Sequence, residues 1–131
     1  MVIFMKIEHI AIWVSDLDLI KDFYQKYFGA TSNNKYHNTK TGFTSYFLSF
    51  EGGARIEIMG RPDIEENNTS KSQFGYAHIA ISLGSKEKVV SLTEQVRNDG
   101  YQVYSEPRTT GDGYFESVIK DPDGNLIEIT V

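Results

Sequence analysis

The sequence contains an internal repeat, and this repeat restricts the chain to folds built from two copies of one unit. The stretches 7–30 and 76–100 both contain His-Ile-Ala-Ile and pass through a short polar turn into an amphipathic helical pattern that stops at glycine, Gly29 or Gly100. Each copy then continues with three shorter strand-like runs, of which the last contains Ile-Glu-Ile. We therefore predict an α+β fold made of two βαβββ modules in tandem.

The length of the chain suits a single domain that contains both copies. A chain of 131 residues corresponds to one domain or to two small half-domains. We assign residues 5–60 to the first module and residues 75–131 to the second. The polar stretch 61–74 connects them, and the single domain that the two modules form spans residues 1–131.

Two helices are expected where apolar residues recur at spacings of three and four. Gly29 and Gly100 follow these stretches and are expected to end the helices, whereas Ser15 and Ser85 precede them as candidate N-caps. The first apolar stripe consists of Leu17, Ile20, Phe23, Tyr24, Tyr27 and Phe28, and the second of Val89, Leu92 and Val96.

Composition and charge exclude several classes of function. The net charge is −5 and the pI is near 5.1, which argues against nucleic acid as a partner because phosphate contacts need clustered Lys and Arg. No apolar run approaches the roughly 20 residues of a membrane span. The chain has no cysteine, so disulfides and thiolate chemistry are excluded. With no secretory signal pattern at the start, we expect a cytoplasmic protein.

Alternation along the predicted strands places four polar side chains on equivalent faces. His9 shares a face with Ala11 and Trp13, and Glu57 shares one with Arg55, whereas the isoleucines point to the opposite side. The second copy repeats this pattern with His78 and Glu128. The isoleucine faces are expected to pack on the helices, so the histidines and glutamates lie on the other face of the sheet.

Two histidines and two glutamates on one surface form a set of ligands that suits first-row divalent ions. Taken singly, a strand histidine is more often structural and a strand glutamate more often faces solvent. The repeat favours the metal site because His9 precedes Glu57 by 48 residues and His78 precedes Glu128 by 50. The third histidine, His37, lies in a polar stretch and is expected to be a surface residue.

Three stretches and the paired βαβββ order resemble the vicinal oxygen chelate superfamily: HIAIWVSDLDLIKDFYQKYFG, GYAHIAIS and IKDPDGNLIEI. This superfamily includes glyoxalase I, bleomycin-resistance proteins, fosfomycin-resistance enzymes, methylmalonyl-CoA epimerase and extradiol dioxygenases. The similarity covers essentially the whole chain and is greatest for small bacterial glyoxalase-like members. It implies that the two modules form an open half-barrel sheet around one site.

The resemblance also implies a ligand set and a reaction. By position, the metal ligands are His9, Glu57, His78 and Glu128, which is the set of glyoxalase I, around one divalent ion of Zn, Ni, Co, Mn or Fe. The implied enzyme is an isomerase or lyase of the lactoylglutathione lyase type, acting on a small molecule with adjacent oxygens. Its ion stabilises an enediolate, Glu128 removes the substrate proton, and Glu57 is able to serve the opposite face.

The residues that contact the rest of the substrate depart from the glyoxalase I pattern. Trp13 stands where bacterial glyoxalase I proteins usually have an arginine that contacts glutathione, and Arg61 where they have an asparagine. Trp13 is a candidate floor for an apolar pocket or a core residue. Arg55, Arg61 and Arg108 are candidate ligands for an anionic substrate group, with solvated surface charges as the alternative, and Arg61 and Arg108 are expected in loops.

Other functions stay open on the residues alone. The chain is alternatively a drug-binding or small-ligand-binding protein of the bleomycin-resistance type, a fosfomycin-resistance-type transferase, or a metal-binding protein without turnover. Four intact ligands argue against the binding protein, and the fourth ligand, Glu57, argues against a dioxygenase. Small two-module members resemble dimers, so we expect a homodimer. The glycine-bearing stretch 106–115 is a candidate flap over the site.

Overall fold

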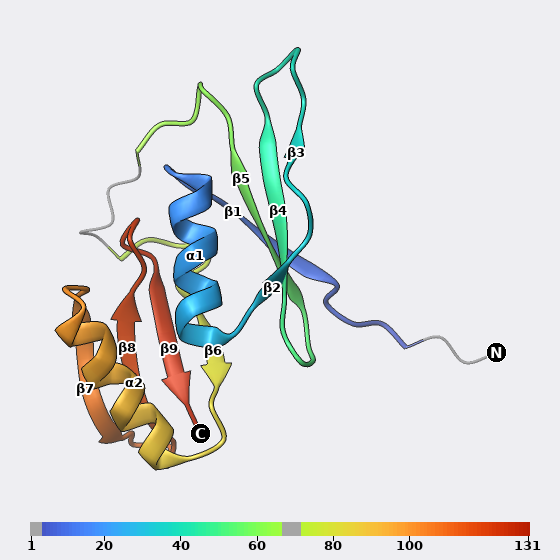
Figure 1. Ribbon diagram of the computed structural model, residues 1–131. Coiled ribbons are helices and arrows are strands. Elements are labelled where there is room, and N and C mark those ends of the chain that lie inside the picture. Colours follow the sequence, from blue (N-terminus) through green and yellow to red (C-terminus); the bar gives the residue numbers. More distant parts are fainter. Residues whose placement is uncertain (1–3, 67–71) are drawn as a thin grey trace. The chain divides into compact units, whose positions relative to one another are not determined.

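The computed structural model describes residues 4–66 and 72–131, and it has the predicted α+β composition (Figure 1). The chain divides into two compact units, Met1–Glu66 and Asn67–Val131. Residues 67–71 of the predicted connector lie outside the described residues. The first unit contains β1 (His9–Trp13), α1 (Leu17–Phe28), β2 (Thr31–Ser32), β3 (Tyr36–His37), β4 (Thr44–Ser49) and β5 (Arg55–Gly60). The second contains β6 (His78–Ser82), α2 (Lys86–Asn98), β7 (Val103–Thr109), β8 (Phe115–Lys120) and β9 (Leu126–Thr130).

Each unit has one sheet, and the two sheets follow the same plan. The strand order is β1-β5-β4-β2 in the first unit, with β3 also paired to β4, and β6-β9-β8-β7 in the second. The first strand of each unit pairs in parallel with the last, β1 with β5 and β6 with β9, and the other pairings are antiparallel. The parallel pairing brings the His-Ile-Ala-Ile strand of each copy beside its Ile-Glu-Ile strand.

The first unit departs from the prediction at the strand that follows α1. One strand was expected there, but the structure has two short strands, β2 and β3, which both pair with β4. Asn33 occupies the break: its backbone N–H donates to the carbonyl of Phe47 at 3.2 Å, and its side-chain oxygen accepts from the N–H of Phe47 at 2.8 Å. The amide side chain replaces a ladder bond, so the strand bends without leaving that N–H unpaired.

The predicted apolar faces form the two cores. In the first unit α1 packs on β4 and β5, and in the second α2 packs on β7, β8 and β9. Ile58 and Ile129 are fully buried in these cores, whereas His9 and His78 on the opposite strand faces are exposed. The remaining fully buried large side chains are Ile20, Tyr24, Leu48, Val89, Val96, Ile119 and Ile127.

The ends of the helices match the predictions at three of four points. Ser85 caps α2 by accepting from the N–H of Lys88 at 3.2 Å. Gly29 ends α1 in the left-handed region at φ 66°, and Gly100 follows α2 at φ 92°. The N-cap of α1 is Asp16 rather than Ser15, because the Asp16 carboxylate accepts from the N–H of Leu19 at 3.0 Å.

The DPDGN motif forms the turn between β8 and β9. Asp121 is 3% exposed, and its Oδ1 accepts from the N–H groups of Asp123 and Asn125 at 2.9 Å each. The amide of Asn125 donates to Oδ2 of Asp121 at 3.0 Å, and Gly124 has a φ of 85° that favours glycine. The motif therefore has a structural role here: it fixes the turn of the β8–β9 hairpin, and Glu128 lies on β9 three residues after Asn125, the last residue of the motif.

A pair of buried hydroxyl groups joins α2 to β8 and allows a first prediction. Thr93 Oγ1 donates to the carbonyl of Val89 at 2.6 Å and lies 2.7 Å from Ser117 Oγ, so Ser117 is the donor between them. Thr93→Val leaves the Ser117 hydroxyl without this acceptor, and we expect the free energy of unfolding to fall by roughly 1–3 kcal/mol. Adding Ser117→Ala is expected to restore part of that loss, measured by urea denaturation; simple additivity of the two changes would contradict the coupling.

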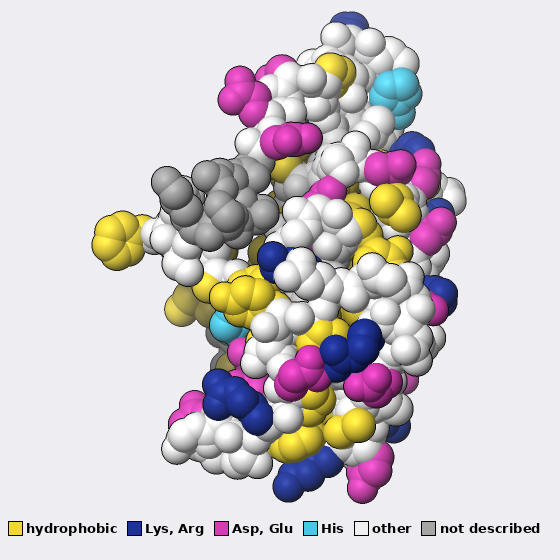
Figure 2. Space-filling model, turned by 90° about the vertical axis from the view of Figure 1, so that its left-hand side faces the viewer, with side chains coloured by type: hydrophobic (Ala, Val, Ile, Leu, Met, Phe, Trp, Pro, Cys, Tyr) yellow, Lys and Arg dark blue, Asp and Glu magenta, His cyan; other side chains and the backbone are white. Residues whose placement is uncertain are grey.

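Neither described helix is long and apolar enough to cross a membrane. Figure 2 shows Lys, Arg, Asp and Glu side chains interspersed over the face that it draws, with no continuous basic area among the described residues there. Mixed charge of this kind agrees with the low count of Lys and Arg, 13, against 18 Asp and Glu.

Candidate functional site

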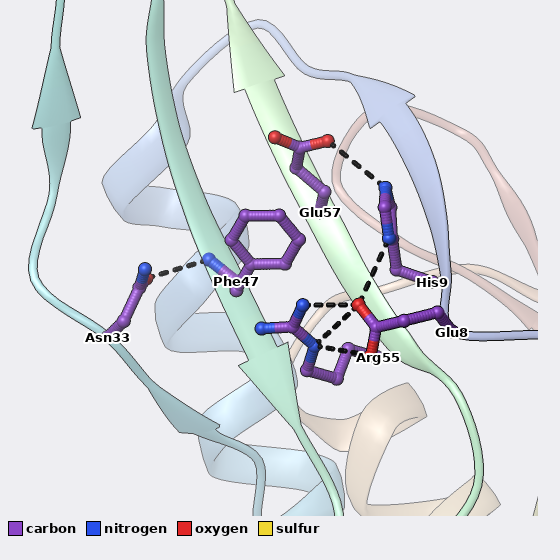
Figure 3. Close-up of polar contacts among 6 residues, drawn as sticks. All are labelled: Glu8, His9, Asn33, Phe47, Arg55 and Glu57. Carbon is purple, nitrogen blue, oxygen red and sulfur yellow. Dashed lines mark hydrogen bonds and ion pairs between the residues drawn. The ribbon is translucent and has the colours of Figure 1, made fainter.

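The first unit brings His9 and Glu57 together across its parallel strand pair. Ala11 of β1 pairs with Glu57 of β5, so His9 is a diagonal neighbour of Glu57 on the same face. The Nε2 atom of His9 lies 3.7 Å from Oε1 of Glu57, as Figure 3 shows. The side chains are 40% and 17% exposed, so the pair is open to solvent from one side.

The second unit repeats this arrangement with a closer contact. Ala80 of β6 pairs with Glu128 of β9, and Nε2 of His78 lies 2.9 Å from Oε2 of Glu128. These side chains are 42% and 22% exposed. The repeat in the sequence is thus also a repeat in structure: each module presents one imidazole nitrogen beside one carboxylate oxygen.

The geometry of each pair suits two neighbouring ligands of one ion. Ligand atoms about 2.1 Å from an ion and at right angles to each other lie about 3.0 Å apart. The separation of 2.9 Å in the His78 pair matches this value, and the 3.7 Å of the His9 pair is wider by less than 1 Å. Within residues 4–66 and 72–131, no group of three or more His, Asp or Glu side chains is placed to hold a metal ion. The four-ligand site stays a prediction.

A second carboxylate, that of Glu8, contacts the Nδ1 side of the His9 ring. Oε1 of Glu8 lies 3.2 Å from Nδ1 of His9, and Arg55 bonds the same carboxylate through Nε at 3.2 Å and through its Nη2 (Figure 3). The hydrogen bond from Arg55 lowers the pKa of Glu8, and the same contact raises the pKa of Arg55. Glu8 is therefore an acceptor toward His9, and Arg55, which we predicted as a substrate ligand, contacts Glu8.

A second carboxylate also stands beside Glu128. Val118 of β8 pairs with Glu128, and Glu116 pairs with Thr130, so Glu116 is a diagonal neighbour of Glu128. A hydrogen bond to Glu128, together with desolvation, raises the pKa of Glu116 to about 7, and the nearby Arg108 only partly offsets this. Sequence reasoning missed Glu116, because its place beside Glu128 depends on the pairing register of β8.

Trp13 and Arg61 meet at the far end of β1. Arg61 lies over the Trp13 ring at 5.0 Å and is also paired with Asp63, and Trp13 meets the Phe43 ring edge-on with centroids 6.2 Å apart. Trp13 is 41% exposed, so it is not a core residue. Beside this cluster lies an open depression of about 700 Å³, lined by Tyr36, Asn38, Thr41, Phe43, Arg61, Pro62 and Asp63.

The structure also shows where Arg108 and His37 lie. Arg108 was expected in a loop, but it lies exposed on β7 and pairs in register with Glu116, because the stretch 106–115 forms the hairpin between β7 and β8. The turn of this hairpin is closed by a hydrogen bond of 2.7 Å from Thr110 to the carbonyl of Tyr114. His37 is exposed as predicted, although it lies on β3.

A model of a known protein family matches nearly the whole chain. The family model described as the Glyoxalase/Bleomycin resistance protein/Dioxygenase superfamily matches residues 6–129. The chain belongs to this superfamily. It is 30% identical over 95% of its length to a protein of Vibrio cholerae named probable lactoylglutathione lyase, covering 88% of that protein. It is also 30% identical over 95% of its length to the lactoylglutathione lyase of Haemophilus influenzae, covering 90% of it.

Solved structures of the superfamily share the fold of this chain. A glyoxalase family protein from Enterococcus faecalis superposes with a TM-score of 0.79 at 22% identity, covering 98% of each chain. A glyoxalase I variant from Zea mays superposes with a TM-score of 0.78 at 24% identity over 95% of this chain, which spans 44% of the maize chain. The tandem βαβββ fold that the resemblance implied is thereby confirmed for this chain.

Proposed function

We propose that this glyoxalase-superfamily chain is a metal-dependent isomerase or lyase that acts on a small substrate with two adjacent oxygens. The observation that carries the proposal is the pair of equivalent His/Glu contacts, 3.7 Å in the first module and 2.9 Å in the second. The names of the Vibrio and Haemophilus relatives support the reaction class. A cytoplasmic location is part of the same proposal.

The proposed ligands of one divalent ion are His9, Glu57, His78 and Glu128. The two pairs have to meet on that ion, within one chain or across two chains of a homodimer, and the homodimer is the form we propose. Neutral imidazole nitrogens and carboxylate oxygens are accepted by Zn, Ni, Co, Mn and Fe. When bound, such an ion supplies Lewis-acid stabilisation of the negative charge that develops on two adjacent substrate oxygens.

The proposed proton transfer belongs to the two glutamates. Glu128 removes the proton from the carbon next to the substrate carbonyl and returns it to the neighbouring carbon. Glu57 holds the equivalent position in the first module, so it serves the opposite face of the substrate. Both carboxylates are about one-fifth exposed, at 17% and 22%, which limits the water that competes for the proton.

The proposed binding region for the rest of the substrate is the Trp13–Arg61 cluster with its open depression. Trp13 lies four residues beyond His9 on the same strand face, so their Cα atoms are about 13 Å apart at the rise of a strand. The aromatic walls suit an apolar substituent, and Arg61 is a candidate for an anionic group. Arg108, on β7 of the second unit, is a separate candidate for such a group. Substrates of this shape are the adducts of 2-oxoaldehydes with thiols that carry an apolar tail.

The first test measures the metal content of the purified, untagged protein after loading with divalent ions and dialysis. We expect close to one ion per chain by inductively coupled plasma mass spectrometry, because four ligands hold an ion through dialysis. His78→Ala is expected to lose most of the metal. His37→Ala is the matched control, since it removes an exposed histidine outside both pairs, and it is expected to retain the ion.

A protein that retains no ion would contradict the enzymatic proposal and favour a ligand-binding protein instead. The observation that supports this second function is the aromatic depression near Phe43. Trp13 is the only tryptophan of the chain, so its fluorescence reports occupancy directly. Saturable quenching by aromatic compounds in the metal-free protein would support the binding function, and no quenching would remove it.

A further inference from the structure

We propose that Glu8, held in place by Arg55, is a positioning residue that fixes the ring of His9 with its Nε2 atom free for the metal. This inference rests on the proposed metal-dependent function. It assigns Arg55 a role behind the histidine instead of at the substrate. The contacts are drawn in Figure 3.

The first step of the argument is the direction of the hydrogen bond between Glu8 and His9. The Glu8 carboxylate accepts two contacts of 3.2 Å from Nε of Arg55 and a further bond from its Nη2. A carboxylate paired with a guanidinium stays ionised and has no proton to give. The contact of 3.2 Å with His9 is therefore a bond in which Nδ1–H donates to Glu8.

The second step is the consequence for the imidazole ring. A neutral histidine carries one ring proton, and the hydrogen bond made by one nitrogen decides which nitrogen carries it. With the proton on Nδ1, the lone pair of His9 is on Nε2, the atom that faces Glu57 at 3.7 Å. Carboxylate partners of this kind orient metal-binding histidines in many proteins, and their loss typically weakens metal affinity by about 10- to 100-fold.

The third step is the packing that restricts the ring. Phe47 of β4 pairs in register with Glu57, and its ring meets His9 edge-on with centroids 5.3 Å apart and an interplanar angle of 84°. The guanidinium of Arg55 lies over the Phe47 ring, 4.2 Å from its centroid. Arg55 thus contacts both the carboxylate and the aromatic ring that border His9, and the backbone N–H of Arg55 donates to the carbonyl of Glu8 at 2.9 Å.

The second module lacks this arrangement, which makes the two histidines different. Ala77 stands before His78 where Glu8 stands before His9, and Leu126 pairs with His78 where Arg55 pairs with His9. Neither Ala77 nor Leu126 has a polar side-chain group. Both histidines face a glutamate through Nε2, His9 at 3.7 Å and His78 at 2.9 Å, so the modules differ at the side of the ring where Glu8 contacts Nδ1 of His9. We infer that His9 is the preorganised ligand of the two.

The experiment has two readouts on the full-length protein. Long-range ¹H–¹⁵N correlation spectra of the metal-free protein, recorded where the histidines are neutral, identify the tautomer of His9. We expect the Nδ1–H form in the wild type and its loss in Glu8→Ala. Glu8→Gln keeps an acceptor oxygen and is expected to retain the Nδ1–H form, which a merely structural role of Glu8 would not require.

The second readout is the dissociation constant for Co²⁺ by isothermal titration calorimetry. We expect Glu8→Ala to weaken binding by about tenfold or more and Glu8→Gln to weaken it less. Glu51→Ala removes another exposed carboxylate of the first unit and is expected to bind within about twofold of the wild type, because Glu51 is not the carboxylate that accepts from His9 and Arg55 and an exposed charge is screened by salt. Thermal denaturation confirms that each variant is folded.

Three results are distinguishable. An unchanged tautomer in Glu8→Ala, or a changed tautomer with unchanged Co²⁺ affinity, would overturn the positioning role while leaving the metal-dependent function intact. A wild type that binds no Co²⁺ would overturn the proposed function and with it the role of Glu8 in metal binding. A lost tautomer together with weakened binding supports both.

Discussion

Glu128→Gln is expected to lower the turnover number for a 2-oxoaldehyde–thiol adduct by about 10²- to 10⁴-fold, the typical contribution of a positioned general base. Glutamine keeps the size of the side chain and an oxygen for the ion, but it cannot take up the substrate proton. The contact of Glu128 with His78 at 2.9 Å leaves the carboxylate at the proposed metal-binding edge of the second module, where the proposed reaction requires a proton acceptor.

The measurement follows exchange of the substrate proton with D₂O by NMR, alongside product formation. Glu57→Gln is the matched comparison, because Glu57 occupies the equivalent position in the first module, and we expect it to have the smaller effect. A larger effect of Glu57→Gln would move the base to the first module. Full proton exchange in both variants would show that neither glutamate is the base.

Ile129→Ala is expected to lower the free energy of unfolding by about 2–5 kcal/mol, the usual range for removing a buried isoleucine. Ile129 is 0% exposed and lies on the helix side of β9, directly after Glu128. Truncation leaves a cavity between this strand and α2, and the surrounding side chains fill such a cavity only in part.

Urea denaturation measures this change, with Ile7→Ala as the control. Ile7 is 68% exposed, so the same truncation there is expected to change stability by less than about 0.5 kcal/mol. Because Ile129 points away from His78 and Glu128, the folded variant is expected to keep the metal content of the wild type. Equal effects of the two truncations would contradict the position of the core in the second unit.

Much of the fold could be predicted from the repeat and from two periodicities. The alternation of Ile56, Glu57 and Ile58 identified the buried and exposed faces of β5, and the spacing of Ile20, Tyr24 and Tyr27 identified the inner face of α1. These are local properties of a strand and a helix, so they can be read without knowing which segments meet. The N-cap at Asp16 was missed because Ser15 beside it has the same capping chemistry.

The two carboxylates beside the His/Glu pairs could not be predicted in this way. Glu8 precedes the first residue of β1, so strand alternation does not apply to it, and its side chain reaches His9 because Arg55 holds it there. Glu116 lies beside Glu128 only through the antiparallel register of β8 and β9. The Glu8–His9 contact depends on Arg55, which is distant in the sequence, and the Glu116–Glu128 contact depends on the backbone pairing of β8 with β9.

The sequence by itself therefore determined the two modules, the buried faces and the four candidate ligands, because the repeat and the periods of strands and helices are local. Only the tertiary structure decided that Arg55 contacts Glu8, that Trp13 is exposed beneath Arg61, and that Arg108 lies on a strand. The physical reason is that strand pairing sets which side chains become neighbours, and pairing is fixed by backbone hydrogen bonds between distant segments.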